Sequence, residues 1–262
     1  MHWLLLRGLV REIRHWGNLP ELFEKTVPGA KTHMLDLPGI GTEIGRVTPA
    51  TVDGIMEDLR ARWLPLRGQD SDGSGEWGIF GVSLGAMVAL SWAARHPEDF
   101  KRMVIINTSA RGLSSATERF RPANLKHFPQ LFVREDRYER EKTILSLTTS
   151  SYSDAPEKLD AVAQRQAEFA PVTSKFRQTG LRQLGAGLMF RVDESLRKNH
   201  PPCLALVSEK DTLVNPVCTV RLAEFLGATV RRHPWGNHDL PQDDAPWIVE
   251  RIREWLQKVA AN

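Results

Sequence analysis

The sequence predicts an α/β fold in which helices cover both faces of a mostly parallel sheet. Short apolar segments alternate with helical segments over much of the chain, which is the pattern of a parallel sheet. One apolar segment runs through a glycine-rich turn into a long apolar helix, and several others end in polar residues. Because the carboxyl ends of parallel strands meet at one edge, we expect the functional site there. The expected strands are residues 3–6, 31–36, 77–80, 102–106, 203–208 and 229–232.

The central segment of this fold is predicted at residues 77–97, which read WGIFGVSLGAMVALSWAARHP. An apolar strand leads into the turn GVSLG (81–85), and a helix follows it. The turn matches G-x-S-x-G, in which small residues on both sides of the serine let the hydroxyl project above the sheet. Ser83 is therefore the candidate nucleophile. The alternative at this point is that the glycines merely end a strand and that Ser83 caps the helix.

Helical segments are expected between the first strands, over residues 19–25 and 48–63. In the second of these, apolar residues recur at helical spacing. They are Val52, Ile55, Met56, Leu59 and Trp63. A polar, glycine-rich surface loop is expected at residues 68–76. The glycines of residues 39–45 do not match the dinucleotide pattern G-x-G-x-x-G, because Ile44 stands in the place of the third glycine.

Residues 110–199 change the pattern from alternation to helices alone. Strand signals vanish there, and breakers rich in proline and serine separate charged amphipathic segments. Because the strand pattern resumes afterwards, we interpret residues 110–199 as an all-helical cap inserted into a core domain of residues 1–109 and 200–262. A separate functional domain is the alternative. The helices expected in the cap are residues 122–134, 137–148, 155–169 and 171–188.

The two ends of the chain carry further signals. The first expected strand begins at residue 3, so the edge strands that usually precede such a strand are expected to be missing. The apolar run of this strand is too short for a signal peptide. Residues 78–94 approach transmembrane length, but a strand, a turn and a helix favour a buried core segment. Residues 246–260 are expected to form a closing amphipathic helix.

Composition and charge exclude several classes of protein. Of 262 residues, 41% are hydrophobic and 26% are charged, as in an ordinary globular protein. The net charge of +3 arises from 35 basic and 32 acidic residues that are interleaved, so no nucleic-acid partner is expected. Cys203 and Cys218 fit neither a disulfide framework nor a metal site, and a reducing, cytoplasmic location is expected. We expect no metal, no cofactor and no membrane partner; the oligomeric state stays open.

Five motifs make the chain resemble the α/β-hydrolase superfamily, in its serine esterase branch with a helical cap. The resemblance covers nearly the whole length and implies the α/β-hydrolase fold. The serine, aspartate and histidine motifs also occur in that family's chain order. The motifs are LLLRGL with the tryptophan that follows it (4–16), DLPGIG (36–41), GVSLGA (81–86), VSEKDTLVNP (207–216) and GNHDL (236–240).

The resemblance implies a catalytic triad of Ser83, Asp211 and His238. A serine hydroxyl is a poor nucleophile at neutral pH, so a neutral imidazole must take its proton, and a carboxylate must orient that imidazole. By the same resemblance, the backbone N–H groups of Leu9 and Leu84 form the oxyanion hole.

Each assignment has an alternative. Glu209 or Asp239 could serve as the acid in place of Asp211. His233 competes with His238 as the base, although a histidine at the end of a strand is ordinarily a surface residue. The remaining histidines, such as His15 and His127, are expected in loops or in the cap.

One position departs from the family, because Arg7 stands before Gly8 where a histidine is common. This leaves the geometry of the oxyanion hole less certain than the nucleophile. Arg11 and Arg14 follow in the same loop and could meet an acidic substrate group, but exposed arginines are usually solvated.

The expected function is cleavage of small or medium acyl esters through an acyl-enzyme on Ser83. Thioesterase, acyltransferase and carbon-carbon hydrolase activities use the same triad and stay open. A non-catalytic ligand-binding receptor on this fold is the alternative of another class. The substrate is expected to contact the cap, where several apolar residues are candidates for an acyl pocket or for the core of the cap. They are Phe128, Leu131, Phe132, Phe169, Phe176, Leu188, Met189 and Phe190.

Overall fold

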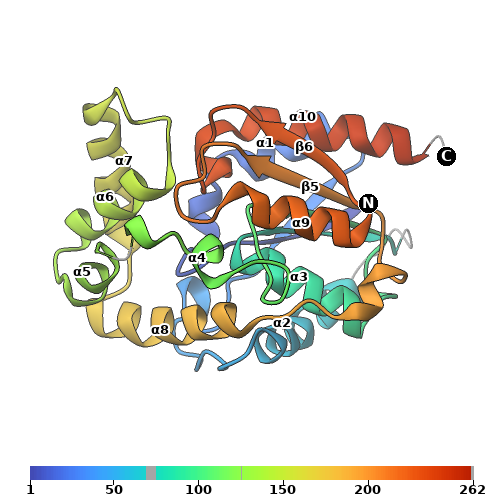
Figure 1. Cartoon of the computed structure of the whole chain (residues 1–262), viewed down its shortest axis with the longest axis horizontal. Helices are drawn as coiled ribbons and strands as arrows, with labels where there is room; N and C mark the ends of the chain where they lie inside the picture. The colour runs from blue at the N-terminus through green and yellow to red at the C-terminus, as the bar shows by residue number, and fades with distance from the viewer. Residues whose placement is uncertain (69–74, 125, 261–262) are drawn as a thin grey trace.

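The computed structural model describes residues 1–68, 75–124 and 126–260, so most of the loop expected at residues 68–76 lies outside the described part. Six strands form one sheet in the order β2-β1-β3-β4-β5-β6, and every neighbouring pair is parallel (Figure 1). The predicted fold class is thus confirmed. The strands are β1 (His2–Leu6), β2 (Lys31–Met34), β3 (Trp77–Val82), β4 (Arg102–Ile106), β5 (Cys203–Ser208) and β6 (Thr229–His233).

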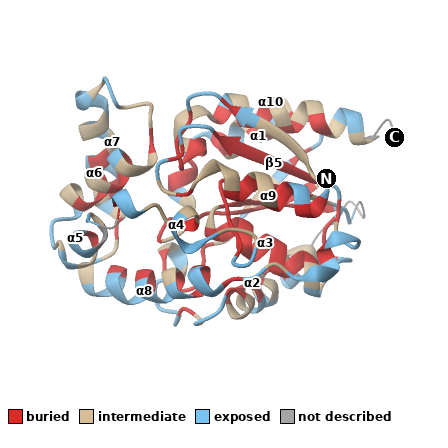
Figure 2. Cartoon of the chain, in the orientation of Figure 1, coloured by how far each residue is buried: buried red, intermediate tan, exposed pale blue. Residues whose placement is uncertain are grey.

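Helices cover both faces of the sheet because each central strand is apolar on both faces. In β1, Leu4 and Leu6 pack into one core cluster, whereas Trp3 and Leu5 pack into the other. This alternation follows from the two-residue period of a strand. The first cluster includes residues of α2 (Val52–Arg67), α3 (Leu84–Arg95) and α9 (Pro216–Leu226), and the second includes residues of α1 (Leu19–Thr26) and α10 (Leu240–Ala260). Figure 2 shows β5 and much of α3 as buried.

Helices α2 and α10 both begin at residues other than those expected from the sequence. Helix α2 begins at Val52 rather than at residue 48, because the side chain of Thr51 accepts a hydrogen bond from the N–H of Gly54 and so caps it. Helix α10 begins at Leu240, before the expected residue 246, and is interrupted at Asp244. The Asp244 carboxylate accepts from the N–H of Trp247, which starts the second part of the helix.

A helical insertion separates β4 from β5. We use this name for five helices: α4 (Ala116–Arg119), α5 (Phe128–Val133), α6 (Arg137–Thr148), α7 (Pro156–Phe169) and α8 (Thr173–Met189). The helix expected over residues 122–134 is wrong as one element, because a 3-10 turn at Pro122–Asn124 precedes the short α5. In Figure 1, α5, α6 and α7 lie at the left, on the side toward which β5 points.

The insertion is tied to the loops at the carboxyl ends of the strands. The Thr212 hydroxyl, which follows β5, donates to the carbonyl of Leu147 in α6. The N–H of Asp239, which follows β6, donates to the carbonyl of Thr148. In the described part of the chain, no helix is both long enough and apolar enough to cross a bilayer.

Candidate active site

Ser83 lies at a sharp turn between β3 and α3. Its backbone has φ 54° and ψ −114°, a left-handed conformation that is rare for a residue other than glycine. The Ser83 N–H donates to the carbonyl of Ile106 at the end of β4. A Cβ on Gly81 would collide with the backbone of Gly85, and a Cβ on Gly85 would collide with the carbonyl of Leu6. The two glycines of the motif are therefore required for this close approach.

Three side chains predicted from the sequence form a continuous hydrogen-bonded chain. The distance from Ser83 Oγ to His238 Nε2 is 3.0 Å, and the distance from His238 Nδ1 to Asp211 Oδ2 is 2.8 Å. The other Asp211 oxygen accepts from the N–H groups of Leu213 and Val214 at 2.8 and 2.9 Å. An ionised carboxylate only accepts, so Nδ1 carries a proton and Nε2 is free to accept the serine proton.

Charges near His238 act against the effect of its burial. Burial disfavours a charged imidazole, but the negative charge of Asp211 and its hydrogen bond outweigh burial, and the pKa of His238 is raised. Asp239 raises this pKa further, whereas Arg7 opposes the rise. The imidazole is thus suited to hold a proton taken from a hydroxyl.

The alternative acids and the alternative base have other partners. Glu209 pairs with Arg232 at the surface, and the Asp239 carboxylate accepts two hydrogen bonds from Arg7. The expectation that His233 is a surface residue is wrong, since it is only 1% exposed. Its Nδ1 accepts from a backbone N–H 2.7 Å away, and its Nε2 lies 3.1 Å from an Asp244 oxygen. These bonds give His233 a structural role at the end of β6.

The proposed oxyanion donors lie beside the serine. Gly8 comes shortly after β1 and packs closely against Ser83. A Cβ on Gly8 would lie 3.2 Å from the Ser83 Cβ. Leu9 follows in a turn that is closed by a hydrogen bond from the Arg11 N–H to the Gly8 carbonyl. Leu84 is the first residue of α3, where a helix leaves N–H groups without an internal partner. Leu9 and Leu84 both line the cavity that reaches Ser83.

An apolar cavity of about 150 Å³ opens between the sheet and the insertion. Of the predicted apolar residues, Leu131, Phe132, Phe176 and Leu188 line it. Phe169, Met189 and Phe190 do not, and the side chain of Phe128 lies outside the described part. Sequence reasoning missed further wall residues, because only the packing of α6 and α8 shows which helix faces turn inward. They are Ile144, Leu147, Gln183 and Leu184.

Arg11 and Arg14, in the loop after β1, are not both solvated. Arg11 is buried and pairs with Glu141 of α6 at 2.5 Å, so the expectation of a solvated side chain is wrong for it. Arg14 is half-exposed, pairs with Glu12 and lies over the Phe169 ring. Both cations therefore already have carboxylate partners within the chain.

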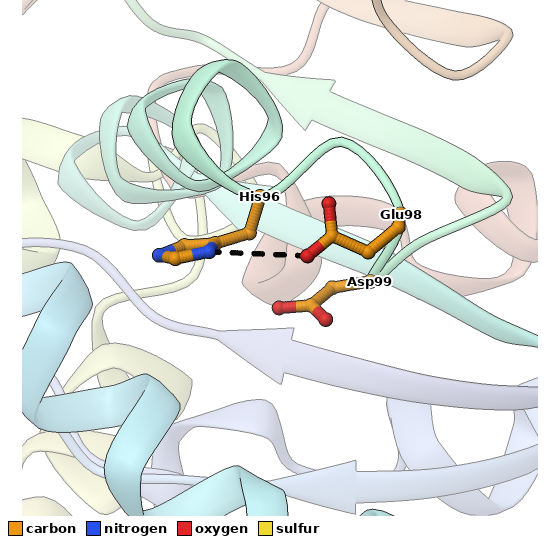
Figure 3. A group of neighbouring side chains, drawn as sticks. All are labelled: His96, Glu98 and Asp99. Carbon is orange, nitrogen blue, oxygen red and sulfur yellow. Dashed lines mark ion pairs between the residues drawn. The ribbon is translucent and has the colours of Figure 1, made fainter.

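A separate cluster of His96, Glu98 and Asp99 lies at the far end of α3 from Ser83 (Figure 3). The buried Asp99 carboxylate accepts from the guanidinium groups of Arg60 and Arg67 and from the indole N–H of Trp92. Since these three donors occupy both oxygens, we interpret the cluster as a structural ion-pair network rather than a metal centre.

Comparison with known proteins identifies a family and a fold. The family model described as "Serine aminopeptidase, S33" matches residues 11–244. A pimeloyl-[acyl-carrier protein] methyl ester esterase from Chromobacterium violaceum is 31% identical over 103 residues, which are 39% of this chain. That match spans only 36% of the relative's length.

Two solved structures are similar over nearly the whole chain. A thermophilic esterase from Thermogutta terrifontis has a TM-score of 0.74 at 19% identity, covering 99% of this chain and 90% of that one. An enol-lactonase from Burkholderia xenovorans has a TM-score of 0.75 at 18% identity, with coverages of 97% and 91%. At such identities, the likeness concerns the fold. Because the family model matches well over half of the chain, the protein belongs to the serine aminopeptidase S33 family within the α/β-hydrolase superfamily.

Proposed function

We propose that this α/β hydrolase cleaves carboxylic esters through an acyl-enzyme on Ser83. The observation that supports this most is the hydrogen-bonded chain from Asp211 through His238 to Ser83, in which Ser83 lies at the wall of an apolar cavity. In this proposal, residues 110–199 act as a cap that encloses the acyl group.

The proposed reaction has two halves. Ser83 Oγ attacks the ester carbonyl carbon while its proton moves to His238 Nε2, and Asp211 stabilises the imidazolium. The N–H groups of Leu9 and Leu84 donate to the oxyanion. The bond to the alcohol oxygen then breaks as Nε2 returns the proton to that oxygen. Water repeats the sequence on the acyl carbon, which releases the carboxylic acid and restores the serine hydroxyl.

The size and lining of the cavity favour a small or medium acyl group as the part of the substrate that it holds. A cavity of about 150 Å³ lined by aliphatic and aromatic side chains holds a group the size of benzene. The similar proteins include esterases and an enol-lactonase, which agrees with an ester bond as the target. A thioester is attacked by the same chemistry, so both classes belong in the test.

The test is intact-mass detection of a fluorophosphonate adduct. The wild type is expected to gain one adduct and Ser83→Ala none. Ser91→Ala is the matched control, because Ser91 is a buried serine of α3, the helix that follows Ser83. Ser91 donates to Asp53 and does not line the cavity. It should label as the wild type does. A folded wild type that takes no label and cleaves no ester or thioester would overturn the proposal in favour of a ligand-binding protein.

A further inference from the structure

A side chain of the insertion contacts the backbone of the turn that carries Leu9. The N–H of Val10 donates a buried hydrogen bond of 2.8 Å to Oε1 of Gln183, which belongs to α8. Gln183 is fully buried and lines the same cavity as Ser83. The insertion therefore reaches the residue next to a proposed oxyanion donor.

Val10 needs such support because its backbone is strained. Its φ is 49°, which a β-branched residue rarely adopts. Conformations of this kind are strained and persist only where the surroundings enforce them. Val10 is the third residue of the turn from Gly8 to Arg11 and directly follows Leu9, so its conformation helps to fix the shape of this turn. If Val10 relaxed, the turn would change shape, and the Gly8–Leu9 peptide that carries the Leu9 N–H would shift with it.

The hydrogen bond from Val10 also fixes the Gln183 amide. Because a backbone N–H donates to it, the group that faces Val10 is the oxygen. The amide nitrogen of Gln183 is buried and has no hydrogen-bond partner in the described part of the chain. Losing the acceptor would leave the Val10 N–H buried and unpaired, which is unfavourable.

The adjacent residue of the turn is tied to the insertion as well. Arg11, next to Val10, forms its buried ion pair with Glu141 of α6. Two helices of the insertion thus hold two consecutive residues of one short turn. Other hydrogen bonds from α8 reach different core loops: Thr179 donates to the carbonyl of Gly39, and Arg182 donates to the carbonyl of Thr48.

We propose that Gln183 is a positioning residue for the oxyanion hole. By accepting from Val10 it holds the turn so that the Leu9 N–H points at the reacting oxygen, and the hole is complete only while α8 is seated on the core. This inference rests on the proposed ester hydrolysis at Ser83. It adds that the insertion takes part in transition-state stabilisation in addition to enclosing the substrate.

The test compares Gln183→Met with two other variants on a p-nitrophenyl ester. Methionine keeps the approximate length and removes the acceptor, so kcat is expected to fall about tenfold to a hundredfold while KM changes little, as for a misplaced catalytic group. Gln183→Glu restores an acceptor oxygen and is expected to recover most of kcat. Thr179→Val is the matched control, because it removes a buried bond from α8 to a different core loop.

Thermal unfolding of each variant separates an effect on the position of the oxyanion donor from an effect on the stability of the protein. Thr179→Val is expected to lose stability to an extent similar to Gln183→Met and to keep the kcat of the wild type. Equal kcat in Gln183→Met and the wild type, or equal loss in both α8 variants, would overturn the role of Gln183. A wild type that is inert toward esters and fluorophosphonate would instead overturn the hydrolase proposal itself, so the two failures are distinguishable.

Discussion

Arg7 and Asp239 are 232 positions apart in the chain and form a buried ion pair with two hydrogen bonds. One guanidinium nitrogen of Arg7 donates to both Asp239 oxygens at 3.0 and 2.7 Å, and the side chains are 3% and 11% exposed. Arg7 precedes Gly8 in the proposed oxyanion loop, and Asp239 follows His238 directly. The residue that departs from the family pattern therefore links the oxyanion loop to the histidine loop.

Removing one partner of this pair should destabilise the fold more than removing both. Arg7→Met leaves a buried carboxylate unpaired, and such a change costs about 3–5 kcal/mol. The double variant Arg7→Met/Asp239→Leu leaves no charge and should recover part of that loss. Urea unfolding of the wild type, the two single variants and the double variant measures the coupling free energy. A single variant as stable as the wild type would show that the pair contributes nothing to stability.

The rate of ester cleavage should begin to fall on the acid side at a pH above the ordinary pKa of histidine. The base must be neutral, and the pKa of His238 is raised above the ordinary value of about 6.5 by Asp211 and Asp239 against burial. The acid limb of kcat/KM is therefore expected above pH 6.5. Asp239→Asn removes one raising charge and leaves Arg7, which lowers the pKa, so the limb should move to lower pH. An acid limb below pH 6.5, or one that Asp239→Asn leaves in place, would contradict this account.

The sequence predicts local features of this fold well because they depend on neighbouring residues. The turn around Ser83 follows from its glycines, and the positions of Asp211 and His238 follow from the strands that precede them. Hydrogen-bond distances join these three side chains, and their catalytic role stays a prediction until Ser83→Ala is tested.

Contacts of the insertion could not be predicted in the same way. The bond between Val10 and Gln183 spans 173 positions, and the pair of Arg11 and Glu141 spans 130. Their formation depends on the rotation of α6 and α8 about their axes and on where these helices pack on the core. Hydrophobic periodicity predicts which face of a helix is buried, but it does not predict which core residue each side chain contacts. For the same reason, the sequence predicts solvated arginines in the first loop, whereas Arg11 is buried.

Two glycine-to-alanine substitutions should have opposite effects on stability. A Cβ at Gly85 would collide with the carbonyl of Leu6, and backbone cannot move aside without separating α3 from β1. Gly85→Ala should therefore destabilise the protein strongly and reduce soluble yield. Gly185 is an exposed residue inside α8 with no atom near its added Cβ, so Gly185→Ala should stabilise the protein by about 0.5–1 kcal/mol. Urea unfolding measures the second, and a destabilised Gly185→Ala would contradict the helix-propensity argument.

The length of the acyl group should respond to Leu184, which lines the cavity from α8. Leu184→Ala enlarges the cavity and should move the optimum of kcat/KM to longer acyl chains, whereas Leu184→Phe should move it to shorter ones. One methylene in an apolar pocket changes discrimination by about 1–3 kcal/mol, so a p-nitrophenyl ester series resolves the shift. Leu181→Ala is the control, since Leu181 lies on the same helix, is 52% exposed and does not line the cavity. If neither Leu184 variant moves the optimum, the acyl group does not occupy this wall, because a side chain that contacts the substrate must change its size limit in both directions.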